Sequence, residues 1–180
     1  MIGNIVAAIT DGGEAATDFE SIATTTLTGS QATIEFASIP TTYQHLQLRV
    51  TCKHATASTA IETALIQFNS TSMTKGHYLY GNGTSALAGV PTNGAVMNIP
   101  GANSTNIFGV GVIDILDYAN TNKNKTFRSL CGTDLNGSGE LVLYSGFYGT
   151  TTAVTNIKLT ISGGHSFAIN SSFALYGIKG

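Results

Sequence analysis

The clearest hydrophobic pattern in the chain runs from Tyr43 to Lys53, where apolar and polar residues alternate strictly. Leu46, Leu48, Val50 and Cys52 fall on one face, and polar residues fill the positions between them. A period of two is the spacing of a β-strand that has one face in a core and the other in solvent. The segment therefore predicts a half-buried strand.

A longer apolar segment spans Ile107 to Tyr118 and is followed by an Asn- and Lys-rich turn and a second strand-like run. This pattern predicts a β-hairpin in the middle of the domain. Both faces of its first strand are apolar, which fits a strand covered on both sides. In a two-layer sandwich the second cover would be another subunit or the N-terminal arm. The predicted subunit interface comprises Ile107, Val110, Val112, Ile113, Asp114, Ile115, Leu116 and Tyr118.

The other strand-like segments are separated by turns rich in Gly, Asn and Thr, and the chain shows no helical period of convincing length. They lie at residues 20–27, 31–36, 61–69, 140–148, 157–161 and 173–178. The first two predict a hairpin, and residues 70–105 predict loops with two or three short strands. Residues 19–180 are thus expected to form one all-β domain without a substantial helix. The expected architecture of this domain is a sandwich of two antiparallel sheets with about 8–10 strands.

Residues 1–18 precede the first strand pattern and carry one short apolar piece that contains Ile5, Val6 and Ile9. Two interpretations stay open, a frayed terminus or an arm that docks on a neighbouring subunit or a capsid. The segment lacks the basic start and long apolar run of a secretory signal, and no run in the chain reaches the ~20 apolar residues of a transmembrane helix. We expect synthesis in the cytoplasm and no membrane insertion.

The chain carries little charge: 10% of its 180 residues are charged, and the formal net charge is -2. Basic residues are scattered singly, so no electrostatic footprint for nucleic acid is present in the sequence. A surface rich in hydroxyls suits packing against copies of the same chain, because burying hydroxyls costs less than burying ions. Cys52 and Cys131 lack the spacing of a metal site and are expected to be buried thiols, with a bridge between them left open.

No motif in the sequence predicts a catalytic group, a cofactor or a metal. The four histidines fall in separate segments, with His45 expected on the polar face of its strand and the others in loops. Asp114 and Asp117 are three apart on a strand, which works against joint acid/base chemistry. We expect Asp114 to pair with Arg128 across the hairpin and Asp117 to cap the next turn. Residues 134–139 imitate half of a calcium loop but lack its bidentate Glu, so they predict a hairpin turn.

Four segments resemble a family of small virion structural proteins of tailed bacteriophages. They are SIPTTYQHLQLRV (38–50), FGVGVIDILDYANTNKNKTFRSL (108–130), NGSG (136–139) and the C-terminal SSFALYGIKG (171–180). The hairpin block together with the YGIKG ending is the most specific part of the resemblance, which covers the chain from about Phe19 onward. It implies a jelly-roll-like β-sandwich on the virion, assembled in the host cytoplasm as a homotrimer. It implies neither catalytic residues nor a cofactor.

Two functions are expected on these grounds. The first is a non-enzymatic capsid decoration (cement) protein that trimerises and bridges subunits of the major capsid protein through its arm and loops. The alternative is a tail-fibre or receptor-binding head, in which a surface-recognition loop with Tyr78, Tyr80 and Asn82 contacts a host cell-surface glycan. A third interpretation, a carbohydrate-active enzyme, lacks a supporting carboxylate pair.

Overall fold

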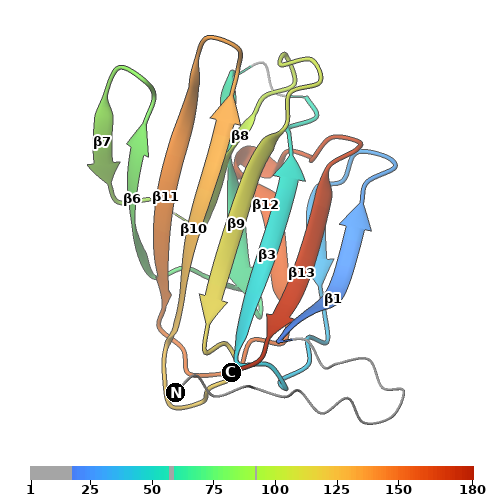
Figure 1. Ribbon diagram of the computed structural model, residues 1–180, viewed down its shortest axis with the longest axis vertical. Coiled ribbons are helices and arrows are strands. Elements are labelled where there is room, and N and C mark those ends of the chain that lie inside the picture. The colour runs from blue at the N-terminus through green and yellow to red at the C-terminus, as the bar shows by residue number, and fades with distance from the viewer. Residues whose placement is uncertain (1–17, 57–58, 92) are drawn as a thin grey trace, which may run out of the picture.

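The computed structural model describes residues 18–56, 59–91 and 93–180. These residues form a sandwich of two antiparallel β-sheets (Figure 1), and their one helical element is a 3-10 turn at Ser162–Gly164. The predicted all-β sandwich is therefore confirmed. The predicted arm residues Ile5, Val6 and Ile9 lie outside the described residues. Within the described ranges, no helix is long and apolar enough to cross a membrane.

The larger sheet has eight strands in the order β1-β13-β3-β9-β10-β11-β6-β7 and lies in front in Figure 1. All neighbouring strands in it are antiparallel. The strands are β1 (Phe19–Thr26), β3 (His45–Cys52), β6 (Lys75–Gly81), β7 (Ala86–Gly89), β9 (Gly109–Leu116), β10 (Lys125–Asp134), β11 (Gly139–Tyr148) and β13 (Ser172–Ile178).

The smaller sheet is built around β4, which pairs with β12 along one edge and with both β5 and β8 along the other. β2 pairs with the far side of β12. Its five strands are β2 (Thr33–Phe36), β4 (Ile61–Phe68), β5 (Thr71–Ser72), β8 (Ala95–Pro100) and β12 (Ile157–Ile161). This sheet packs behind β3, β9 and β10 (Figure 1), and the core lies between the two layers.

The strand order is that of a jelly roll with insertions. If β1, β2, β3, β4, β8, β9, β12 and β13 are numbered as eight successive strands, one sheet has the order 1-8-3-6 and the other 2-7-4-5. This interleaving of early and late strands is the double Greek key of a jelly roll. The inserted strands β10, β11, β6 and β7 extend the larger sheet, and β5 extends the smaller one. They explain why the described residues contain more strands than the expected ~8–10.

The alternation of β3 places one complete row of side chains in the core, as predicted. Leu46, Leu48 and Cys52 are fully buried and Val50 is nearly so. Cys131 of β10 is buried as well, and both cysteines are free thiols. Burial raises the pKa of Cys131 to about 11 and raises the pKa of Cys52 further still. The expectation of two buried thiols is thus confirmed.

The predicted hairpin between residues 20–27 and 31–36 is wrong. β1 pairs with β13 in the larger sheet, whereas β2 pairs with β12 in the smaller sheet. The connection crosses between the layers and is held by backbone hydrogen bonds from Leu27 N to Ser171 O and from Phe167 N to Gln31 O. A short Gly-containing loop can join two paired strands of one sheet or lead from one sheet to the other. The period of two in each segment does not specify its partner strand.

The described part of residues 70–105 contains four strands rather than two or three. The last of them, β8, pairs with β4 at an edge of the smaller sheet and is buried along most of its length against the larger sheet. It packs closely against β9, where a Cβ atom added to Gly111 would lie 2.9 Å from Met97 Sδ. A glycine at this position therefore allows the two sheets to approach each other.

Candidate functional site

The predicted interface strand, β9, has two faces with different surroundings. Ile113 and Ile115 point into the core and are 1% and 0% exposed, and Tyr118, just beyond the strand, is fully buried. These three side chains pack inside their own chain, so their predicted role in a subunit interface is wrong. The smaller sheet, not a second subunit, covers this face. Ile107 is half-buried and precedes the strand, which begins at Gly109.

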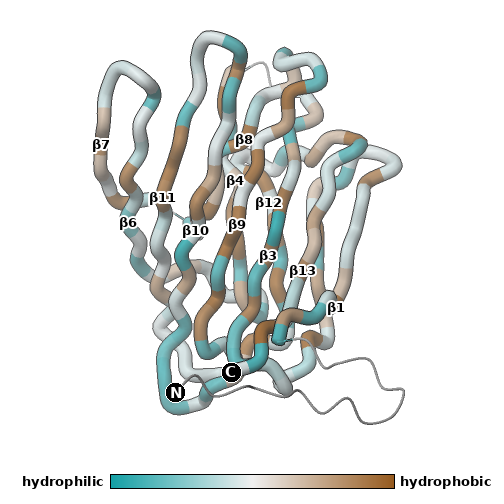
Figure 2. Tube along the Cα trace, in the orientation of Figure 1, coloured by the Kyte–Doolittle hydropathy of each residue, from teal (hydrophilic) through white to brown (hydrophobic). Residues whose placement is uncertain are grey.

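The opposite face of β9 belongs to a continuous exposed patch on the larger sheet. Neighbouring strands place Val112, Leu130, Leu143 and Leu79 opposite one another in a single row. The next row adds Val110 and Leu141, and hydrophobic positions recur along β9, β10 and β11 in Figure 2. We call this set the aliphatic patch: Leu79, Val110, Val112, Leu130, Leu141 and Leu143, with exposures of 39–60%. Six adjacent exposed aliphatic side chains make this patch a candidate interaction surface.

Leu116 lies on the same outer face of β9 and is 40% exposed, but it opposes Thr126 rather than another aliphatic side chain. Between Leu116 and the aliphatic patch lies a polar row. Arg128 Nε donates to Asp114 Oδ2 at 3.1 Å, which confirms the pair predicted across the hairpin. Gln47 of β3 donates to the other carboxylate oxygen at 2.9 Å. The outer face thus has an apolar centre with a hydrogen-bonded polar border, as interfaces commonly do.

The turn after β9 is held from the inside by Lys125. Its side chain is fully buried, and Nζ donates to the carbonyl oxygens of Asn120, Lys123 and Thr151. Burial lowers the pKa of Lys125 below its ordinary value. The turn is closed by a backbone hydrogen bond from Asn120 N to Asp117 O at 3.0 Å, so the cap predicted for the Asp117 side chain is replaced by a main-chain contact. Its carboxylate pairs with Lys123 Nζ at 2.6 Å, and that contact lowers the pKa of Asp117.

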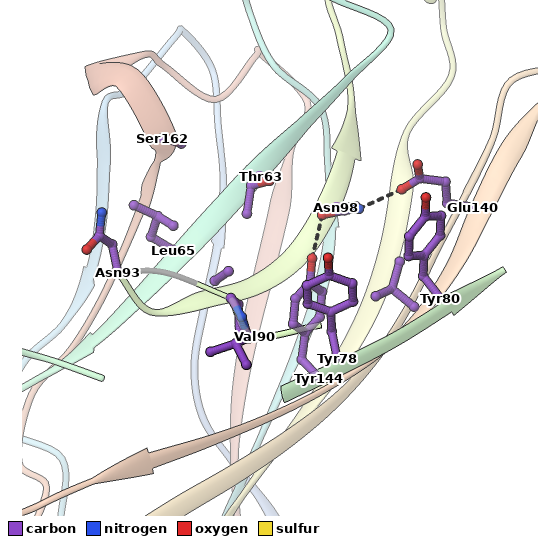
Figure 3. Close-up of a pocket in the computed structure, with 13 residues that line it drawn as sticks. Thr63, Leu65, Tyr78, Tyr80, Val90, Asn93, Asn98, Glu140, Tyr144 and Ser162 are labelled. Carbon is purple, nitrogen blue, oxygen red and sulfur yellow. Dashed lines mark hydrogen bonds between the residues drawn. The ribbon is translucent and has the colours of Figure 1, made fainter. Parts of the chain in front are cut away.

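A cleft with a volume of about 420 Å³ lies on the inner side of the larger sheet, between β6 and β11 and the facing strands β4 and β8 (Figure 3). Three tyrosines share it. The ring centroid of Tyr78 lies 6.0 Å from that of Tyr80 and 5.9 Å from that of Tyr144. Tyr78 and Tyr80 are half-buried, whereas Tyr144 is buried beneath them at 5% exposure. We call this site the tyrosine cleft.

A chain of hydrogen bonds connects the polar groups of the tyrosine cleft (Figure 3). Tyr144 Oη donates to Asn98 Oδ1 at 2.7 Å, and Asn98 Nδ2 donates to Glu140 Oε2 at 2.6 Å. Burial raises the pKa of Tyr144, so its hydroxyl remains a donor. Sequence reasoning missed these three residues. The sequence does show that Glu140, Val142 and Tyr144 share one face of a predicted strand. It does not show which strands lie opposite that face, because this depends on the strand order.

The prediction that Tyr78 and Tyr80 lie in a surface loop is wrong. Tyr78 and Tyr80 lie on β6 and point inward, whereas Leu79 between them points outward, because Tyr-Leu-Tyr alternates as a strand does. Asn82 lies in the β6–β7 turn, where its Oδ1 accepts from Ser85 N at 2.9 Å. The structure therefore brings the two tyrosines together in the cleft but leaves Asn82 outside it.

The remaining candidate groups serve local structure. His45 Nδ1 accepts from Asp117 N at 3.0 Å, and His77 lies on β6 rather than in a predicted loop. Residues 134–139 form the turn between β10 and β11, as predicted, with Asp134 Oδ1 accepting from Asn136 N at 2.9 Å. Across the part of the chain that the structure describes, no group of three or more His, Cys, Asp or Glu side chains is placed to hold a metal.

The fold and its surfaces define a class of protein, a jelly-roll β-sandwich with an apolar outer face and an aromatic cleft. No family model, curated protein or solved structure matches the chain. Functional inference therefore rests on the geometry of the aliphatic patch and the tyrosine cleft.

Proposed function

We propose that the protein is a non-enzymatic structural protein of a tailed-bacteriophage particle, a homotrimeric capsid decoration protein located on the virion. The observation that carries the proposal is the aliphatic patch on the outer face of the larger sheet. Its partners are other copies of the chain and the major capsid protein. Two features support the phage setting: the resemblance of the hairpin block and the C-terminal YGIKG to small virion proteins, and the jelly-roll topology, which is common among viral capsid proteins.

The patch alone leaves little or no net free energy for holding two copies together. Each of its half-exposed side chains contributes about 1 kcal/mol when it is covered, whereas association costs about 4–15 kcal/mol. The complete outer face is larger, since eight strands of roughly seven residues, spaced ~4.8 Å apart, cover on the order of 900 Å². A stable interface takes about 800 Å² from each partner. The contact therefore uses more of the face than the aliphatic patch alone. In a cyclic trimer this face packs against a different surface of the neighbouring copy, so that three such contacts close the ring.

The polar border makes such a contact specific. Asp114 is already neutralised by Arg128 and hydrogen-bonded by Gln47 within its own chain. A partner that covers this row therefore buries a satisfied network rather than an unpaired charge. The six residues of the aliphatic patch are uncharged, and the exposed Arg49 of β3 lies at its edge, opposite Val112. Depletion of charge at the centre and polar groups at the rim are the compositional signs of a protein interface.

The tyrosine cleft differs in its carboxyl groups from the usual site of a glycoside hydrolase. Hydrolysis of glycosidic bonds generally uses two carboxyl groups on either side of the substrate. Among the described residues that line the cleft, Glu140 is the one that carries a carboxyl group, and this group accepts a hydrogen bond from Asn98.

The proposed role on the capsid is tested by counting copies in purified particles. Quantitative mass spectrometry, with the major capsid protein as internal standard, should find on the order of hundreds of copies per particle, because decoration sites repeat over a symmetric lattice. Cryo-electron microscopy of the same particles should show three-fold density on the capsid surface. A few dozen copies or fewer, confined to the tail, would contradict the proposal.

The second candidate function, a tail-fibre or receptor-binding head, is favoured by one observation, the accessible aromatic cleft. Fluorescently labelled protein should then bind host cells, and an excess of unlabelled protein should reduce infection. Protein that neither binds host cells nor competes with particles would contradict this function, whatever its copy number.

A further inference from the structure

The tyrosine cleft combines accessible aromatic faces with fixed polar groups on its wall. Tyr78 and Tyr80 come from one strand, and their rings are inclined at 44° to each other. Asn98 and Glu140 reach the cleft from β8 and β11, and both are half-buried (Figure 3). We propose that this cleft binds a neutral saccharide, which stacks on Tyr78 and Tyr80 and is hydrogen-bonded by Asn98 and Glu140. The proposal specifies the ligand class of the receptor-binding function and is independent of trimer formation.

The aromatic part of the cleft suits the apolar face of a sugar ring. One side of a pyranose presents C–H groups, which pack against an aromatic ring, while its hydroxyls point outward. Tyrosine provides such a flat apolar surface together with a polar edge. Two inclined rings whose centroids are 6.0 Å apart form a platform for one or two sugar units. The volume of about 420 Å³ lies in the range of small-ligand pockets, about 300–1,000 Å³.

The polar part of the cleft is oriented before any ligand binds. Because Tyr144 Oη donates to Asn98 Oδ1, the amide nitrogen of Asn98 is directed toward Glu140. Glu140 Oε2 accepts that hydrogen bond, and among the described residues Oε1 has no hydrogen-bond partner. Two lone pairs on Oε1 can therefore accept from adjacent sugar hydroxyls. A network fixed in advance lowers the entropy that binding has to overcome.

The charge of the cleft selects among sugars. Glu140 is the one charged side chain among its described lining residues. A carboxylate accepts hydrogen bonds from neutral hydroxyls but repels the carboxylate of a uronic or sialic acid at the same place. The cleft should therefore favour neutral sugars over their acidic counterparts.

The neighbouring strand is built to keep Tyr78 in position. Tyr78 of β6 pairs with Gly89 of β7, and a Cβ atom added to Gly89 would lie 2.6 Å from Tyr78 Oη. The tyrosine ring thus lies across the backbone of the adjacent strand, which only a glycine permits at this distance. A side chain at position 89 would push the ring out of place, because the three atoms nearest to its Cβ atom all belong to Tyr78.

The test is a titration of the ¹⁵N-labelled protein, followed by NMR, with D-glucose, D-galactose, D-mannose and N-acetyl-D-glucosamine, each to roughly 100 mM. At least one neutral sugar should shift the amide resonances of β6, β8 and β11 with a millimolar Kd. D-glucuronic acid and N-acetylneuraminic acid should bind at least about tenfold more weakly. No shift with any neutral sugar, or shifts confined to other parts of the sandwich, would overturn the proposal.

Four variants locate the site and separate it from assembly. Tyr80→Ala and Gly89→Val should each weaken binding by about tenfold or more, and Glu140→Gln should remove most of the preference for neutral sugars. His77→Ala is the matched control, because His77 lies on the same strand as Tyr80 but faces outward. It should bind as the wild type does, and equal losses in Tyr80→Ala and His77→Ala would overturn the proposal. If the protein binds host cells but binds none of these sugars, the saccharide proposal is overturned and the receptor-binding function is retained.

Discussion

Replacing Lys125 with methionine removes the buried ammonium group that holds the turn after β9. Methionine is similar in length and uncharged, so the apolar part of the side chain keeps its packing. The donors to the carbonyl oxygens of Asn120, Lys123 and Thr151 are lost. These oxygens then face an apolar side chain at a position that is fully buried in the wild type.

Two opposing effects determine the size of the change. Each carbonyl oxygen left without its donor costs about 1–3 kcal/mol, while the ammonium group no longer has to be removed from water, which offsets several kcal/mol of that loss. Three acceptors outweigh one desolvated cation, and we expect the free energy of unfolding to fall by about 2–4 kcal/mol. For a domain of this size the Tm should drop by roughly 5–15 °C.

Urea unfolding and differential scanning calorimetry measure this change directly. Lys123→Met is the matched control, because Lys123 lies in the same turn with a side chain that is 61% exposed. Its pair with Asp117 is a surface ion pair, so its loss should leave the Tm nearly unchanged. An unchanged or raised Tm in Lys125→Met would refute the reasoning, since the buried ammonium group would then destabilise the turn.

Three further predictions concern the core, the contact between the sheets and the β1–β13 edge. Leu48→Asp places an unpaired charge between the sheets and should cost more than ~4 kcal/mol. A loss below ~1 kcal/mol in urea unfolding would contradict the burial of that face. Gly111→Val should cost about 1–3 kcal/mol, because its Cβ meets a buried methionine sulfur at 2.9 Å. Gly29→Val, which has open space around it, is the control, and equal Tm values for the two variants would contradict the close contact. At the β1–β13 edge, the hydrogen bond from Lys179 holds the pKa of Glu20 below its ordinary 4.5 and raises the pKa of Lys179 above 10.5. The advantage of the wild type over Glu20→Gln should be constant between about pH 5 and 10. It should fade as the pH drops through the lowered pKa of Glu20 or rises through the raised pKa of Lys179, and an advantage unchanged at about pH 2 would contradict this.

Much of the fold could be predicted because a period of two is a local property. The strict alternation around Leu48 places one strand correctly, and the two apolar faces of β9 are divided as Ile113 inward and Val112 outward. The Asp114–Arg128 pair follows from the antiparallel register of β9 and β10, two strands that are consecutive in the sequence. Such features depend on residues close together in the sequence.

The rest depends on which strands become neighbours, and local patterns do not contain that information. The tyrosine cleft is assembled from β4, β6, β8 and β11, so no single segment of the sequence predicts it. The aliphatic patch likewise combines leucines from three inserted or late strands with the valines of β9. Lys125 was available to sequence reasoning, since it shares its face with the buried Phe127, but a lysine in an Asn-rich turn is ordinarily exposed.

The central claim, that copies of the chain associate through the aliphatic patch, is tested most directly by the mass of the protein in solution. Light scattering on a size-exclusion column should give three times the chain mass of 18.6 kDa for the wild type. Leu130→Asp, at the middle of the patch, should elute as a monomer that keeps the β-sheet circular dichroism spectrum of the wild type, with a lower Tm because the stabilisation by the partner copies is lost. Thr33→Asp, an exposed position on the smaller sheet, should remain a trimer. A monomeric wild type, or a Leu130→Asp variant that stays trimeric, would contradict the account.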